Sequence, residues 1–260
     1  MSDAGLFGPR SMAWRIDRER AVLLAGTRSL LMQLAHPRVA LGVAHHSDFR
    51  HRPFRRLART LTLSLDSIFG DTPTALRAVR RINATHARIH GAGYTAFDAD
   101  LLVWVMATLV DSGVLAYERF VGPLTDAQKD AYYRETRDAT RLLGMPPSAA
   151  PADFSGLRAY VAAMIASGEV KVGDIGLALG RATLYPPAAW YVPRPVKDGI
   201  VFVTAGLLPR ALRIQFELPW STRHRAAFEA FSRGVRATLP LLPARLRYVP
   251  QALSARRRVA

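Results

Sequence analysis

Two histidines four positions apart, His86 and His90, are the residues of this sequence whose types and spacing most directly suggest chemistry. Apolar residues recur at three-to-four spacing through residues 74–90, which predicts a helix with both imidazoles on or beside its apolar stripe. A neutral imidazole is a common metal ligand. The pair therefore predicts a site for a metal ion or for a cofactor that contains one.

A second helix, expected after a short glycine-rich link, would supply the opposite wall of this pocket. Asp98 is a typical N-cap residue, and residues 99–114 are apolar nearly all round, as in a buried helix. This helix carries Trp104, Thr108 and Asp111, which we expect to face the two histidines. An apolar pocket with few polar groups would suit a flat, apolar cofactor.

From the residues alone, several interpretations of the histidine pair stay open. The pair could bind one metal ion from a single helix face, but the zinc-protease motif needs a glutamate where this sequence has Ala87. A non-haem iron site would need a carboxylate, which Asp111 or Glu118 could supply. Alternatively, one histidine is a haem ligand and the other contacts the pocket, or both are hydrogen-bonded histidines at the edge of the core.

Further candidates lie upstream of the pair. His36 precedes a proline, which favours an extended or helix-terminal conformation in which its ring could cap a carbonyl. Arg56, Arg59 and Thr60 fall on adjoining positions of one helix, so their side chains could converge on one place or form a solvated basic edge. The other histidines of this region lie in a polar loop and are expected to be solvated rather than metal-bound: His45, His46 and His51.

The elements that must position these residues are helices. No segment shows a competing strand-like alternation, and there is no internal repeat. The sequence therefore predicts an all-α fold, a single globular domain of many helices. The helical segments are expected over residues 15–35, 53–70, 74–90, 99–114, 125–144, 157–167, 173–185, 199–208 and 224–238.

This single domain divides into parts along the sequence. Residues 1–144 are expected to form a helical core that contains the pocket, and residues 145–153, rich in proline and alanine, to connect it to the rest. Residues 154–250 are expected to form a C-terminal helical portion of the same domain. Residues 251–260 are expected to be a frayed basic tail.

Composition limits the classes of function. The chain of 260 residues has no cysteine, which excludes disulfides, cysteine-ligated haem or iron–sulfur clusters, and cysteine catalysis. Its net charge of +16 favours anionic partners, but no nucleic-acid-binding motif accompanies it. We therefore expect no specific nucleic-acid partner. Without a signal peptide or a membrane-spanning apolar run, the chain is expected to be cytoplasmic, with peripheral association with the inner membrane face as an alternative.

Several motifs, taken together and in order, resemble a large bacterial family that includes the latex-clearing rubber oxygenases and the MpaB-type fungal oxygenases. The resemblance covers residues 15–144 well and the later half loosely, through LLPRALR and LPW. In the rubber oxygenases the fold is all-helical and holds haem b, with a histidine as proximal ligand and an Arg-x-x-Lys-Thr motif on the distal side. The motifs that carry the resemblance are QLAHPRVALGV, RLART, INATHARIHG, LLVWVMATLVDS with YE, and YYRE followed by LLG.

The resemblance implies a haem b pocket in which His86 is the iron ligand, while His90 takes a place where the family often has arginine. The distal motif falls on Arg56, Arg59 and Thr60. Arg59 departs from the motif's lysine, and a guanidinium has no free lone pair with which to ligate iron. The sixth position is therefore expected to be open or water-filled, unless His36 or His90 reaches it.

The activity that the resemblance implies is that of a haem-dependent oxygenase. Its partners would be dioxygen, an electron donor of unknown identity, and an apolar, isoprenoid- or lipid-like small molecule lying against residues such as Trp104 and Met106. Thr108, Asp111 and His36 are further candidates for cofactor contacts. Two other classes stay open: a non-haem metal enzyme that uses His86 and His90, and a non-catalytic basic helical protein that binds a membrane surface or a partner.

Overall fold

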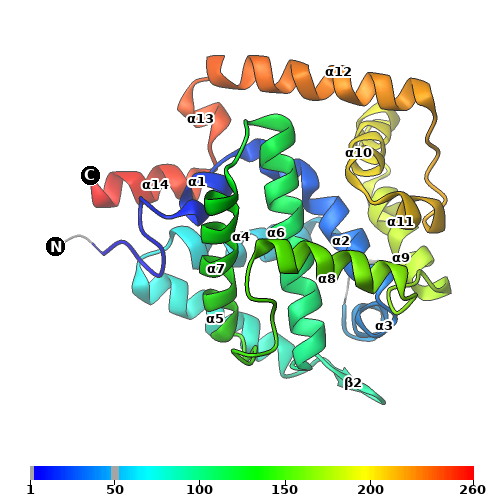
Figure 1. The fold of residues 1–260 in the computed structure, drawn as a ribbon, viewed down its shortest axis with the longest axis horizontal. Coiled ribbons are helices and arrows are strands. Elements are labelled where there is room, and N and C mark those ends of the chain that lie inside the picture. Colours follow the sequence, from blue (N-terminus) through cyan, green and yellow to red (C-terminus); the bar gives the residue numbers. More distant parts are fainter. Residues whose placement is uncertain (1–2, 48–52) are drawn as a thin grey trace.

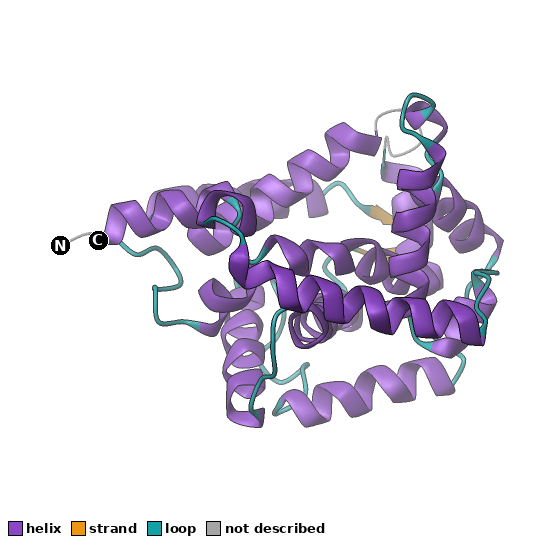
Figure 2. Ribbon diagram, turned by 90° about the horizontal axis from the view of Figure 1, so that it is seen from above, coloured by secondary structure: helices purple, strands orange, loops and turns teal. Residues whose placement is uncertain are grey.

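The computed structural model describes residues 3–47 and 53–260, with only the backbone described for residues 53–56. Helices dominate the fold, which confirms the predicted all-α class (Figure 2). The first half of the chain contains α1 (Met12–Asp17), the 3₁₀-helix η1 (Arg20–Ala25), α2 (Gly26–Ala35), α3 (Pro37–His46), α4 (Pro53–Phe69), α5 (Thr72–His86), β1 (His90–Gly91), β2 (Tyr94–Thr95), α6 (Ala99–Phe120) and α7 (Asp126–Arg141). The second half contains α8 (Phe154–Ala166), α9 (Asp174–Leu184), η2 (Pro187–Ala189), α10 (Arg194–Leu207), α11 (Arg210–Gln215), α12 (Thr222–Thr238), η3 (Leu239–Leu241), α13 (Ala244–Arg247) and α14 (Pro250–Val259).

Helix α6 is the central element, and the other helices pack around it (Figure 1). It contacts η1, α2, α7, α8 and α12, and it continues past residue 114 because Tyr117 and Phe120 extend its buried surface. By length and composition this helix could span a membrane, but 72% of its apolar window is buried inside the fold. This burial explains why the residues of α6 are apolar nearly all round the helix.

The prediction of one helix over residues 15–35 is wrong, because the chain turns between α1 and η1. Glu19 is extended there and forms an isolated antiparallel bridge with Tyr248. Its fully buried carboxylate accepts hydrogen bonds of 2.8 and 2.9 Å from the guanidinium of Arg247. A buried carboxylate needs such a partner, so this contact between distant segments overrides the helical periodicity.

The predicted helix over residues 74–90 is also too long, since α5 ends at His86 and a short antiparallel hairpin follows. In the hairpin, His90 pairs with Thr95 and Gly91 with Tyr94. Gly93 has a φ of 80°, a conformation that glycine adopts without strain in a tight turn. His86 and His90 therefore do not share a helix face, and the interpretation that required this is wrong.

One hydrophobic core runs through both halves of the chain. Helix α9 packs on α2 and α3, α10 packs on η1 and α2, and α12 crosses the end of the molecule opposite the hairpin (Figure 1). The C-terminal helix α14 returns to the start of the chain, where Arg258 donates hydrogen bonds to the carbonyls of Asp3 (2.9 Å) and Phe69 (2.8 Å). The expectation of a frayed tail is wrong, because these contacts anchor it.

Candidate functional site

A cavity of about 540 Å³ lies between the N-terminal helices and the segment from α9 to α10. Its walls come from α1, η1, α2, α4, α5, α6 and α7 on one side and from α9, η2 and α10 on the other. Several large apolar side chains that are 40–54% exposed turn their surface to it: Leu23, Leu57, Leu109 and Ile200. A concave apolar surface of this size is typical of a small-molecule site.

The wall of this cavity carries a partly buried acid, Asp17, hydrogen-bonded to a tyrosine. The hydroxyl of Tyr132 donates to Asp17 Oδ1 over 3.0 Å. Burial raises the pKa of Asp17 to about 7; the Tyr132 hydrogen bond acts to lower it, and the nearby Glu135 adds to the rise. A carboxyl group with this pKa exchanges a proton near neutral pH, as a general acid or base must.

Sequence reasoning missed this pair, and the reason is separation along the chain. Asp17 is the last residue of α1, while Tyr132 lies 115 residues later on α7. In the sequence, Tyr132 has the pattern of an ordinary aromatic residue of the core. The carboxylate of Glu135 sits nearby because it caps α1, accepting hydrogen bonds from the backbone of Met12 (3.1 Å) and Ala13 (2.8 Å). No local pattern in the sequence indicates these contacts.

Behind the α2 wall, Thr108 supports a polar group that reaches the cavity. The amide of Gln33 donates to the hydroxyls of Thr108 and Ser29, both over 3.1 Å, and both Gln33 and Ser29 line the cavity. Trp104 is fully buried and donates to the Met32 carbonyl over 3.2 Å, away from the lining residues. Thr108 and Trp104 thus face α2 and not the two histidines.

Asp111 lies in a buried ion pair next to the same wall. Its Oδ2 is 2.6 Å from the Arg28 guanidinium, and Arg158 is 3.6 Å from the other oxygen. Arg28 also donates to the Leu207 carbonyl (2.9 Å) and to the hydroxyl of Ser112, which lines the cavity. Burial lowers the pKa of Arg28, and the Asp111 charge opposes that effect. This network joins α2, α6 and α10 rather than facing α5.

His86 lies one turn beyond Ile82, the last residue of α5 on the cavity wall, and is not itself a lining residue. Its ring packs edge-on against Phe97, with centroids 5.9 Å apart. Nδ1 is buried and has no hydrogen-bond partner among the described residues. Burial lowers the pKa of His86, so the ring is neutral at physiological pH and can act as a metal ligand.

The distal motif lies on α4, which packs along α5. Thr60 lines the cavity. Arg59 is exposed and makes no hydrogen bond or ion pair with the part of the chain that the structure describes. The side chain of Arg56 lies outside the described residues, so its predicted convergence with Thr60 stays a prediction.

The remaining histidines of this region gather around the hairpin rather than the cavity. His90 is exposed, and its carbonyl is 3.0 Å from the His46 Nε2 atom. His45 Nδ1 is 3.1 Å from the Tyr94 hydroxyl. In the described part of the chain these rings form no group of three metal ligands, and His51 lies outside it.

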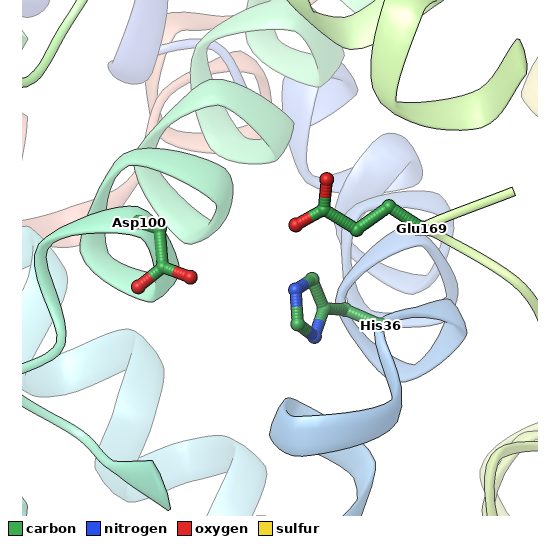
Figure 3. A group of neighbouring side chains, drawn as sticks. All are labelled: His36, Asp100 and Glu169. Atoms are coloured by element: carbon green, nitrogen blue, oxygen red, sulfur yellow. The ribbon is translucent and has the colours of Figure 1, made fainter. Parts of the chain in front are cut away.

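His36 lies at the junction of α2 and α3, away from the cavity wall. Its side chain is 3% exposed, and neither ring nitrogen has a hydrogen-bond partner among the described residues, so the expectation that it caps a carbonyl is wrong. The carboxylates of Asp100 and Glu169 lie beside the ring (Figure 3). The sequence indicated His36 as a candidate but not these two partners.

Comparison with known proteins places this chain in a family. A family model described as "ER-bound oxygenase mpaB/B'/Rubber oxygenase, catalytic domain" matches residues 14–237. The chain belongs to this family. The matched residues of this MpaB/rubber oxygenase domain include all but the first three residues of the cavity wall and extend into the C-terminal portion. The resemblance seen in the motifs is therefore confirmed.

Its relatives carry no further functional detail. One uncharacterized protein of Mycobacterium bovis and one of Mycobacterium tuberculosis are each 25% identical over 237 residues, covering 86% of this chain and 91% of the relative. No solved structure matches the chain. Membership of an oxygenase family thus points to oxygen chemistry with a metal or haem cofactor and leaves the choice between them to the site itself.

Proposed function

We propose that the protein is an oxygenase that uses haem b and acts on an apolar, isoprenoid- or lipid-like small molecule. The observation that carries the proposal is the cavity of about 540 Å³ with its exposed leucine and isoleucine side chains. Such a surface costs free energy in water and is stabilised when an apolar molecule covers it. A reaction of the oxygenase family needs both a cofactor and a substrate near such a surface.

The residues present fit a haem. His86 extends from a helix that lines the cavity, is neutral because burial lowers its pKa, and has a buried Nδ1 without a hydrogen-bond partner among the described residues. We propose His86 as the residue that would hold the iron, with the apolar wall from α4 and α5 against the macrocycle. When bound, haem b would supply the iron centre at which dioxygen is activated.

Around this centre the chain's own residues have separate roles. Thr60 offers a hydroxyl on the cavity wall, and the neighbouring Arg59, which has no partner among the described residues, offers a permanently charged donor. Asp17 can hold or release a proton near neutral pH while Tyr132 fixes the orientation of its carboxyl. Lys197 on the α10 wall offers a cation to the polar head of a lipid-like substrate. The electron donor and a peripheral membrane contact stay predictions from the sequence.

The test is the visible absorption spectrum of the purified protein with and without its histidines. We expect the wild-type chain to carry a Soret band, His86→Ala to lose it while keeping its far-UV circular dichroism, and the exposed control His90→Ala to keep it. Full haem content in His86→Ala would remove His86 as the ligand. A wild-type protein that takes up no haem when reconstituted would overturn the haem proposal.

A further inference from the structure

The buried ring of His36 marks a second place where a ligand can bind, outside the cavity of the proposed function. Both its ring nitrogens are buried and have no hydrogen-bond partner among the described residues. Buried polar atoms in folded proteins nearly always have a partner, so each exception needs an explanation. The ring comes from the α2–α3 junction, held there because Pro37 begins α3 and leaves His36 extended at its N-cap.

Two carboxylates from distant segments complete the surroundings of this ring. Asp100 lies in the first turn of α6, and Glu169 lies in the connection between α8 and α9. One ligand atom from each of the three residues lies within 4.8 Å of the others. Figure 3 shows the Glu169 carboxylate next to the imidazole and the Asp100 carboxylate turned toward it from the other side.

These separations are close to those of a coordinated ion. Metal–nitrogen and metal–oxygen bonds of about 2.0–2.2 Å keep two ligands of one ion within about 4.4 Å of each other. Small side-chain rotations supply the remaining few tenths of an ångström. Both carboxylates are on exposed residues, so these rotations do not disturb the core.

The charges around the ring suit a cation. Burial lowers the pKa of His36, and so does Arg38, while Asp100 and Glu169 act to raise it, so the imidazole is available in its neutral, ligating form. Arg38 forms ion pairs with Asp98 and with one oxygen of Asp100. The Glu169 carboxylate makes no hydrogen bond or ion pair with the described residues, so it is free to bind.

We propose that His36, Asp100 and Glu169 form a binding site for one divalent transition-metal ion. One imidazole and two carboxylates favour Zn²⁺, Fe²⁺ or Mn²⁺ over Ca²⁺ and Mg²⁺, which prefer oxygen ligands alone, and over Cu⁺, which prefers sulfur. The ion joins the α2–α3 junction, the start of α6 and the α8–α9 connection, so its binding stabilises the native state. Three protein ligands leave coordination positions for water.

The test uses the full-length protein, freed of metal with a chelator and titrated with Co²⁺, whose visible absorption reports its ligands, and with Zn²⁺ by calorimetry. We expect one ion to bind per chain and to raise the melting temperature. Glu169→Gln, a change of one exposed group, should weaken binding about tenfold or more. The control Glu229→Gln, at a carboxylate that is 41% exposed and pairs with Arg119, should bind as the wild type does.

Several results would overturn the site. The first is that the wild-type protein binds no metal ion, and the second is that Glu169→Gln binds the ion as tightly as the wild type. The third is that His36→Gln retains the ion fully, which would place the ion elsewhere, such as at the histidines around the hairpin. The haem proposal is tested by a different measurement, the Soret band. We expect this band to be the same in Glu169→Gln and in the wild type. Loss of one signal therefore leaves the other interpretable.

Discussion

Replacing Asp17 with asparagine should remove a penalty on folding that grows as the pH rises. Asp17 lies on the cavity wall with a pKa raised to about 7 from an ordinary value of 3.8, mainly through burial. Asparagine has nearly the same shape and keeps the oxygen that accepts the Tyr132 hydrogen bond, but it cannot ionise. The substitution therefore isolates the ionisation of this one group.

The sign follows from proton binding in the two states. Between pH 3.8 and pH 7 the unfolded chain has released the Asp17 proton and the native chain still holds it, so raising the pH favours unfolding. Each pH unit in that window is worth about 1.4 kcal/mol, so the wild type should lose on the order of 3 kcal/mol relative to Asp17→Asn between pH 5 and pH 7. Above pH 7 both states are ionised at this group, and the difference levels off.

The assay is urea unfolding of both proteins at half-unit steps from pH 5 to pH 8. Other titrating groups are common to both proteins and cancel in the difference between their free energies of unfolding. Asp126→Asn is the control, because that side chain is 97% exposed and carries the same charge. A difference between Asp17→Asn and wild type that stays constant over this range would refute the raised pKa, and with it the proposed proton-handling role.

Two further predictions concern the walls of the cavity. Arg28→Ala should lower the free energy of unfolding by about 3–5 kcal/mol in urea titrations, because it leaves the buried Asp111 without its 2.6 Å partner. A loss below about 1 kcal/mol, the level of an exposed ion pair, would contradict the view that this pair is buried. Ser64→Trp should weaken binding of an apolar fluorescent probe about tenfold, or 1.4 kcal/mol, because Ser64 lines the cavity. Thr85→Trp, at an exposed position of α5, is its control, and equal probe binding by the two variants would place the probe elsewhere.

The fold class could be predicted from the sequence because helical periodicity and caps are local signals. Helix α7 is an example: the sequence predicts a helix over residues 125–144, and the structure begins it after Thr125, whose hydroxyl accepts a hydrogen bond from the Gln128 backbone. The errors come where a distant segment decides the local structure. Glu19 breaks the first helix because its buried carboxylate meets Arg247, a partner 228 residues away.

The candidate site divides in the same way. His86 and Thr60 could be indicated from the sequence, since motif and helix position mark them, and the structure places Thr60 on the cavity wall with His86 one turn beyond it. Asp17 could not be found, because its unusual pKa depends on burial and on a tyrosine from another helix. The sequence indicated His36 as a candidate site residue. Its neighbours Asp100 and Glu169 could not be predicted, because they come from segments that only the fold brings together.

The two sides of the cavity differ in how closely their sequences resemble the oxygenase family. The side from α4 and α5 carries Thr60 and leads to His86, and it belongs to residues 15–144, where the motifs match the oxygenases well. The other side, from α9 to α10, carries Lys197 and Ile200 and belongs to the later half, where the motifs LLPRALR and LPW are the segments that resemble the oxygenases. In the proposed function a substrate fills the space between both sides, so changes in the second side would alter which molecule fits while leaving Thr60 and His86 in place. Under that proposal, we expect substitutions of the lining residues within 183–200 to change which apolar molecule binds.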